Sequence, residues 1–300
     1  MFQRVIIATT PWTVFPPIEK CVKNLKEFGT EKLYLLQCLQ EKEIPGINLE
    51  LTKKLLKPTI VKQKKSLENA GFDVEPKICV ESAQKEIHTL ALEENCSLVV
   101  LESSKDTRFY ELLFGGNIAS EKIQRQTLPI LLIPTLSSKK QESFIEEDTC
   151  KLLKHILFLT DFSVNAEHAF SYLKRLIEKK PQQVTLLHIQ NKTFISPHLT
   201  YRLDEFNKID ALRLKKLKNE ILSDNSTKVN VEIRYGHPVK EIIAFSASNQ
   251  VSLIVMGKQG RGFLKEVFIG SISQNVARLS ESPVLLIPMP EKDRYTIVSG

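Results

Sequence analysis

The stretch VSLIVMGKQGRGFLKEVFIGSIS, residues 251–273, is the most informative part of the sequence, because its residue pattern changes twice, first from apolar to glycine-rich and then to helical spacing. Its first part, SLIVMG at 252–257, is a continuous apolar run that ends in glycine, as expected of a strand covered on both faces of a parallel sheet. Three more glycines follow, and from Ser271 onward apolar residues recur at helical spacing. The stretch therefore predicts a strand, a glycine-rich connection and a helix, the repeating unit of a parallel α/β sheet.

The glycines of this connection lie where a parallel sheet binds ligands. Gly257 ends the strand, and open α/β sheets bind ligands beyond the carboxyl ends of their strands. The helix that follows presents free N–H groups and the positive end of its dipole, which suit a phosphate. The spacing Gly257-x2-Gly260-x9-Gly270-Ser271 therefore predicts two sets of amide donors around one anion. Two other interpretations stay open: the glycines only shape a turn, and Ser271 with Gln274 forms a capping box that needs no ligand.

The chain repeats itself at an offset of about 150 residues. Five segments of the first half resemble five segments of the second half in the same order. The pairs begin at Arg4 and His155, Glu31 and Gln182, Phe72 and Val229, Cys96 and Val251, and Leu128 and Ser282. We therefore expect a tandem of two homologous domains.

Each half holds five short apolar runs separated by segments long enough for a helix, such as AEHAFSYLKRLIEK at 166–179. Strands alternating with helices indicate a parallel sheet, so we expect two doubly wound α/β domains, each with five parallel strands and helices on both faces. The polar segment before residue 152 is typical of a linker. The expected boundaries are 1–136 for the first domain, 137–151 for the linker, 152–290 for the second domain and 291–300 for a C-terminal tail.

A second candidate group follows the first strand of the second half. The run ILFLTDFS, residues 156–163, ends its apolar part at Thr160 and Asp161. An aspartate just beyond a strand can accept hydrogen bonds from a ribose or a base. It can equally cap the helix that follows, and the sequence leaves both roles open.

Composition and charge exclude several classes. A hydrophobic fraction of 42% and a charged fraction of 26% are typical of globular proteins. No run approaches the ~20 apolar residues of a membrane span, and the first residues lack a signal-peptide pattern, so we expect a cytoplasmic protein without a membrane partner. The net charge is +7, but the lysines are spread along helices, so we expect no nucleic-acid partner.

The five cysteines, all in the first half, form no C-x-x-C pair. This spacing is neither a disulfide framework nor a zinc site, and we expect no metal site and reduced, mostly buried thiols.

Together, the glycine spacing, Asp161 and the short runs LLHI, GHP and LIVMG resemble the ATP-binding branch of the universal stress protein family, and the repeat is similar to its tandem members. The resemblance implies five parallel strands in the order 3-2-1-4-5, with ATP at the switch point between the first and fourth strands. It also implies contacts for the nucleotide. These are Leu159, Thr160, Asp161, Ile189, Met256 and Gly257 for the adenosine, and Gly260, Arg261, Gly270, Ser271 and Ile272 for the phosphates.

Without the resemblance, Ile189 and Met256 are equally explained as core residues, and His188 is expected to be a packed strand-end histidine. Whether Mg²⁺ accompanies the ATP stays open.

The first half departs from the pattern, because Thr10 stands where the second half has Asp161. Aligned on the last strands, Glu102 and Ser103 fall opposite Met256 and Gly257, Asp106 opposite Gly260, and Asn117 opposite Ser271, while Gly116 keeps its glycine. The acidic side chains would repel phosphates. We therefore expect the first domain not to bind ATP in this way.

No phosphate-loop, zinc-protease or nucleophile-elbow motif occurs, and no group is placed to activate a water at the γ-phosphate, so no catalytic residue is predicted. We expect an ATP-binding stress protein whose occupancy modulates conformation or association, with at most slow ATP hydrolysis. Two alternatives stay open: a nucleotide-using enzyme, and an interaction scaffold with a vestigial site.

We expect the two halves to pack as a pseudo-dimer through the apolar strands PILLIP at 129–134 and PVLLIP at 283–288, because edge strands need cover. Pairing of two chains stays open. The segment 191–208 is a candidate lid over the adenine site.

Overall fold

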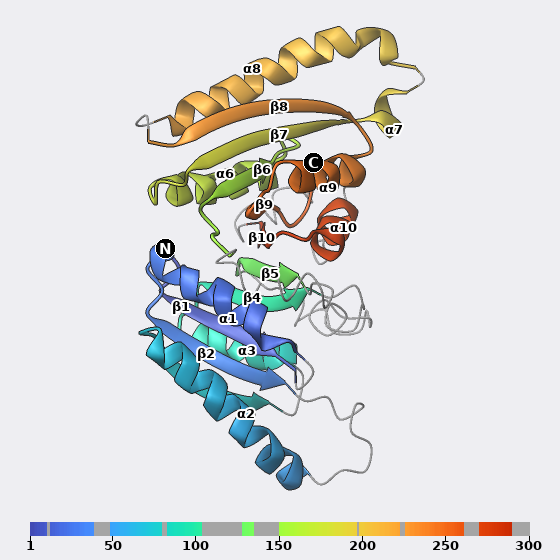
Figure 1. Cartoon of the computed structure of the whole chain (residues 1–300). Helices are drawn as coiled ribbons and strands as arrows, with labels where there is room; N and C mark the ends of the chain where they lie inside the picture. The colour runs from blue at the N-terminus through green and yellow to red at the C-terminus, as the bar shows by residue number, and fades with distance from the viewer. Residues whose placement is uncertain are drawn as a thin grey trace. The chain divides into compact units, whose positions relative to one another are not determined.

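The computed structural model describes residues 1–10, 13–38, 49–79, 83–103, 128–134, 150–196, 198–222, 226–260 and 270–289, with only the backbone at 49–53. These residues belong to two compact units, Met1–Cys150 and Lys151–Gly300 (Figure 1). Some predictions lie outside the described residues. They concern Arg261, Asp106, Gly116, Asn117, most of the 137–151 linker and the 291–300 tail.

The first unit contains a parallel sheet. Its strands are β1 (Arg4–Thr9), β2 (Lys32–Cys38), β3 (Asp73–Cys79), β4 (Leu98–Ser103) and β5 (Ile130–Pro134). They lie in the order β3-β2-β1-β4-β5, and each neighbouring pair is parallel. The helical elements are α1 (Phe15–Lys23), the 3-10 helix η1 (Asn24–Phe28), α2 (Leu49–Asn69) and α3 (Ala83–Glu93). Figure 1 shows α1 and α2 in front of these strands and α3 behind them.

The second unit repeats this arrangement. Its strands are β6 (His155–Leu159), β7 (Gln183–Asn191), β8 (Lys228–Gly236), β9 (Leu253–Gly257) and β10 (Val284–Ile287). They lie in the order β10-β9-β6-β7-β8, again with parallel neighbours. The helical elements are α6 (Val164–Ile177), α7 (Lys192–Ile195), the 3-10 helix η3 (Thr200–Arg202), α8 (Leu203–Ile221), α9 (Pro238–Ser248) and α10 (Ser271–Leu279).

Helices cover both faces of the second sheet. Successive side chains of a strand point to opposite faces, and β7 shows this directly. Gln190 contacts Asp210 of α8, whereas Thr185 contacts His155, which in turn contacts Asn249 at the end of α9. Helices α9 and α10 lie side by side (Figure 1). The predicted α/β fold with parallel strands and covering helices is confirmed.

The local sequence explains where the helices begin. The run predicted to be helical at 166–179 forms α6, which starts two residues earlier because Ser163 caps it: the Ser163 side chain accepts a hydrogen bond from the Ala166 N–H at 3.2 Å. The helix buries Ala169, Leu173 and Leu176 against the sheet, as the apolar spacing indicates.

The cysteines correct one prediction. Cys21 of α1 and Cys150 form a disulfide, so the expectation of reduced thiols is wrong for these two residues. They lie 129 residues apart, and only the fold brings them together. The other three, Cys38, Cys79 and Cys96, are buried thiols outside any disulfide, as expected. Burial raises the pKa of the Cys96 thiol to about 11, so this thiol stays protonated at neutral pH.

Among the helices that the structure describes, none is both long and apolar enough to cross a membrane.

Candidate functional site at the carboxyl ends of β6 and β9

The two central strands of the second unit place the candidate residues at one edge of the sheet. Strands β6 and β9 are parallel neighbours, with Ile156 opposite Leu253 and Phe158 opposite Val255. Their carboxyl ends therefore lead side by side into the turn that holds Asp161 and the loop that begins after Gly257. The chain leaves β6 toward β7 on one side and reaches β9 on the other, so this is the switch point of the sheet.

Asp161 lies against the glycine loop. A Cβ atom added at Gly260 would come within 2.8 Å of the Asp161 Oδ2, so a side chain there would displace the Asp161 carboxylate. The other carboxylate oxygen, Oδ1, accepts a hydrogen bond from the Ser163 N–H at 3.0 Å. Asp161 thus shapes the turn before α6, but Ser163 is the cap of that helix. Asp161 is therefore not the cap residue of α6.

The two ends of the glycine loop are tied together. The Gly270 N–H donates to the Lys258 carbonyl at 3.0 Å, and the Ser273 hydroxyl donates to the Gly257 carbonyl at 3.1 Å. The Lys258 N–H in turn donates to the Ile287 carbonyl of β10 at 2.7 Å. These bonds hold the end of β9 beside the start of α10.

The capping box considered for Ser271 and Gln274 does not form. Gly270 is the cap residue of α10, and no side-chain hydrogen bond caps the helix. Ser271 is the first helical residue and is exposed. The first turn of α10 therefore offers its backbone N–H groups beside the end of β9.

The structure gives the glycines a reason that the sequence did not reveal. A Cβ at Gly257 would lie 3.0 Å from the Nδ2 and 3.1 Å from the Cγ of Asn165, a residue of the first turn of α6. Gly257 and Gly260 thus lie tightly against Asn165 and Asp161, two side chains of the protein itself. At Gly270 the nearest atoms would lie at 3.5–3.6 Å, which is ordinary contact. Sequence reasoning missed Asn165, because nothing in the sequence indicates that it meets a residue 92 positions later.

The apolar candidates fall into two groups. Leu159 and Met256 are 6% and 7% exposed, so their main role is core packing. Thr160 is also buried, and its hydroxyl accepts a hydrogen bond from the Phe162 N–H at 3.0 Å. Ile189 at the end of β7 is half-buried, and Ile272 of α10 is 38% exposed, so both keep surface that a ligand can contact.

A buried polar cluster supports the Asp161 turn from the α8 side. Asp210 of α8 accepts a hydrogen bond from the Gln190 amide at 3.0 Å and lies 3.5 Å from the His188 Nε2. The other ring nitrogen of His188 contacts the Thr160 carbonyl at 2.8 Å. Arg213 pairs with Asp210 at 3.6 Å, and its guanidinium lies 5.2 Å from the Phe162 ring centroid.

His188 is thus a packed histidine, as expected, while Asp210 is a second residue that sequence reasoning missed. The only signal would have been an acidic residue on the buried side of a lysine-rich helix.

The corresponding edge of the first unit is chemically different. Thr10 follows β1, and its N–H donates to the Thr13 hydroxyl at 2.9 Å. At the end of β4, Glu102 is half-buried and Ser103 is buried. The described part of this edge therefore has a threonine and a glutamate where the second unit has Asp161 and Met256.

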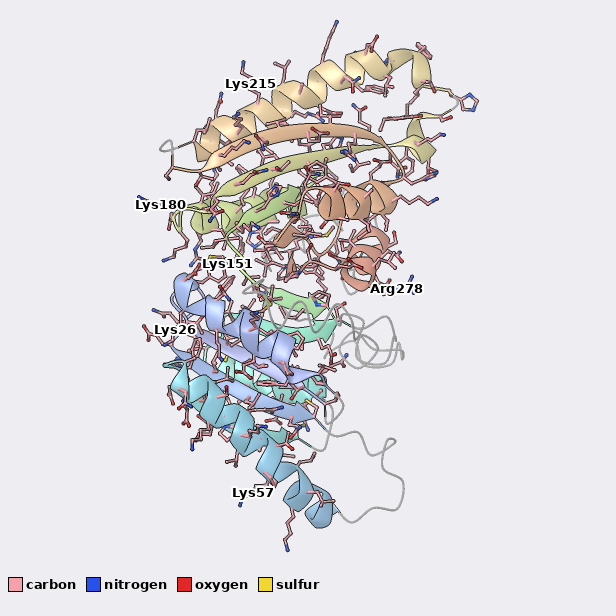
Figure 2. The ribbon with its side chains drawn as sticks, in the orientation of Figure 1. Lys26, Lys57, Lys151, Lys180, Lys215 and Arg278 are labelled. Carbon is pink, nitrogen blue, oxygen red and sulfur yellow. A yellow bond between two sulfur atoms is a disulfide. The ribbon has the colours of Figure 1, made fainter. Side chains whose placement is uncertain are left out.

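Basic side chains are distributed over separate elements. Figure 2 shows Lys57 on α2 and Lys215 on α8, and both are exposed. In the described residues, no group of three or more His, Cys, Asp or Glu side chains could hold a metal ion. The distinctive feature of the second unit is therefore a set of backbone donors beside one aspartate.

Comparison with known proteins gives a consistent result. Residues 153–288 match the universal stress protein family. Universal stress protein MJ0577 of Methanocaldococcus jannaschii is 32% identical over 154 residues, which cover 45% of this chain and 95% of that relative. A universal stress protein from Archaeoglobus fulgidus has a similar fold over 96% of this chain and 97% of its own, with a TM-score of 0.65 and 19% identity. A universal stress protein solved in complex with cAMP is 17% identical over 45% of this chain and 97% of its own, with a TM-score of 0.36, which is too low to inform on the ligand here.

Proposed function

Because the chain belongs to the universal stress protein family, we propose that its second domain, 152–290, binds ATP and that occupancy modulates the conformation or association of the protein. The observation that carries this proposal is the meeting of Asp161 with Gly260 at the switch point, beside the loop that the Gly270–Lys258 bond closes. One side of this site offers a carboxylate and the other offers backbone amides.

These two sides match the two ends of a nucleotide. The N–H groups of the loop and of the first turn of α10 suit the phosphates, and the helix dipole adds a favourable potential. The Asp161 carboxylate accepts hydrogen bonds and so suits the hydroxyl or amino groups of an adenosine. Ile189 is half-buried and Ile272 is exposed, so both keep apolar surface that we propose a nucleotide contacts. Arg261 remains a proposed phosphate contact.

The proposal includes Mg²⁺ only as a companion of the phosphates. Mg²⁺ is commonly held by one or two carboxylates together with substrate phosphates, and the described residues contain no larger group of ligands at the site. We also propose that any ATP hydrolysis is slow, because the sequence shows no group clearly placed to activate a water at the γ-phosphate.

The domain organisation belongs to the same proposal. The first domain, 1–136, contains strands β1–β5 and is proposed to have a degenerate nucleotide site. The linker 137–151 joins it to the second domain, and 291–300 is a tail. We further propose a cytoplasmic protein without membrane or nucleic-acid partners, in which the two domains pack as a pseudo-dimer and two chains can pair. Small-angle scattering tests the packing, because two freely tumbling domains would contradict it.

One observation favours a second candidate, an interaction scaffold with a vestigial site. Gly257 and Gly260 are both explained by contacts with Asn165 and Asp161, without any ligand. A nucleotide-using enzyme is a third reading, and it would show turnover with a second substrate.

Titration calorimetry with ATP separates the first two candidates. One binding event per chain, weakened when Asp161 is replaced by alanine, supports the nucleotide site. If the protein unfolds cooperatively and yet binds no ATP, the scaffold is supported.

A further inference from the structure

Asn165 is an unusual residue for its position in the second unit. It lies in the first turn of α6, yet it is only 1% exposed. Its Nδ2 donates a hydrogen bond to the Gln259 carbonyl at 2.9 Å. Its Oδ1 is buried and has no hydrogen-bond partner in the described part of the chain. Burying an amide with one unpaired oxygen is unfavourable, so the bond to Gln259 has to compensate for it.

The bond holds the glycine loop just beyond the sheet. The last described bond between the sheet and this segment is the one from the Lys258 N–H to the Ile287 carbonyl. Asn165 binds one residue further along, and the Gly257 backbone packs closely against its side chain. The Asn165–Gln259 hydrogen bond and the close contact at Gly257 therefore join helix α6 to the described part of the loop.

Because the peptide bond is planar, the bond from Asn165 to the Gln259 carbonyl also fixes the direction of the next N–H group. A trans peptide is planar, and its C=O and N–H point in opposite directions. When Asn165 fixes the Gln259 carbonyl toward α6, the N–H of the next residue, Gly260, points away from α6. A Cβ at Gly270 would lie 3.5 Å from the Gly260 nitrogen, so this amide lies beside the start of α10.

We infer that Asn165 is a positioning residue that turns the Gly260 N–H away from α6, beside the start of α10. This inference rests on the proposed function, because the ATP phosphates are proposed to bind the Gly260 amide and the first turn of α10. An aspartate could not replace Asn165, because its carboxylate would face the Gln259 carbonyl without a donor.

The test uses the full chain with Asn165→Leu, which keeps a similar volume but removes the donor. Asn249→Leu is the matched control, since the Asn249 Nδ2 donates to the Phe245 carbonyl at the same distance, 2.9 Å, in α9. Two quantities are measured: amide hydrogen exchange of Gly260 and Gly270 in nucleotide-free protein by NMR, and the affinities for ATP and for adenosine by calorimetry.

We expect Asn165→Leu to speed exchange of the Gly270 amide, which closes the loop, and to weaken ATP binding by about tenfold, the effect of one hydrogen bond. Adenosine affinity should stay within about twofold, because Asp161 is untouched. The control should change none of these values.

Unchanged exchange in Asn165→Leu overturns the inference, and so does an equal loss of ATP and adenosine affinity, which would indicate general damage to the site. If the unaltered protein binds no ATP, the proposed function fails by itself. The exchange rates then still decide whether Asn165 positions the loop.

Discussion

Position 270 allows a test of phosphate binding that leaves the fold intact. A side chain at Gly270 would meet only ordinary contacts at 3.5–3.6 Å, and the backbone there has an extended ψ and a negative φ of −59°. Gly270→Asp and Gly270→Asn should therefore both fold. The two side chains have nearly the same shape and differ in charge. A Gly257→Glu variant would be a poorer test, because its side chain would collide with Asn165.

The size of the expected loss in ATP affinity follows from the distance between position 270 and Gly260 of the loop. The Cβ would lie 3.5 Å from the Gly260 nitrogen, which places the Asp carboxylate roughly 6 Å from a phosphate held by that amide. Two unit charges at about 6 Å repel by about 1.4–2.8 kcal/mol for an effective dielectric constant of about 20–40. ATP affinity should therefore be about 10- to 100-fold lower for Gly270→Asp than for Gly270→Asn.

Calorimetric titration with ATP at two salt concentrations is the assay. The difference in ATP affinity between the two variants should become smaller as the salt concentration rises, because screening weakens the repulsion. Adenosine, which carries no phosphate, should bind both variants equally. Equal ATP affinities for Asp and Asn at low salt would refute the placement of the phosphates at the start of α10.

Three further predictions concern stability. Reducing the Cys21–Cys150 disulfide, whose cysteines lie 129 residues apart, should lower the free energy of unfolding by about 4–5 kcal/mol in urea titrations. The control Cys96→Ser keeps this disulfide and should therefore keep the full stability difference between oxidised and reduced protein. Asp210→Ala should cost about 2–4 kcal/mol, because it leaves Gln190, His188 and Arg213 without their shared acceptor, whereas the exposed Asp204→Asn on the same helix should cost under about 1 kcal/mol. Burial lowers the pKa of His155 below its ordinary value of 6.5, so the unfolded chain binds the proton more readily than the folded chain. The contribution of His155 to stability should be complete above about pH 6.5 and fall as the pH drops toward its folded-state pKa. A His155→Gln variant should lose that pH dependence.

Much of the fold could be predicted from the sequence because the strands follow a local rule. Buried parallel strands are continuous apolar runs, and SLIVMG and ILFL both formed strands where this pattern placed them. The helix that buries Leu173 and Leu176 was likewise indicated by apolar spacing. The predicted start of α6 was less accurate, because the residues just before and just after a helix cap show little difference in sequence pattern.

The candidate site was only partly predictable, because its remaining features depend on residues far apart in the chain. The sequence placed Asp161 and Gly260 at one edge, and the structure brings them into contact. It could not reveal that Asn165 fills the space beside Gly257, or that Asp210 joins α8 to the turn. The Cys21–Cys150 bond was missed for the same reason, since cysteine spacing carries no information about which helix meets which loop.

Mass spectrometry of small molecules released from freshly purified protein shows whether the second domain holds one nucleotide. The unaltered chain and the Gly270→Asn variant are compared with Gly270→Asp and Asp161→Ala. We expect ATP at close to one per chain in the unaltered protein and a large loss in Gly270→Asp and in Asp161→Ala. An unaltered protein that releases no nucleotide and takes up none when ATP is added would contradict the proposed nucleotide site, and the glycines would then serve only to accommodate Asn165 and Asp161.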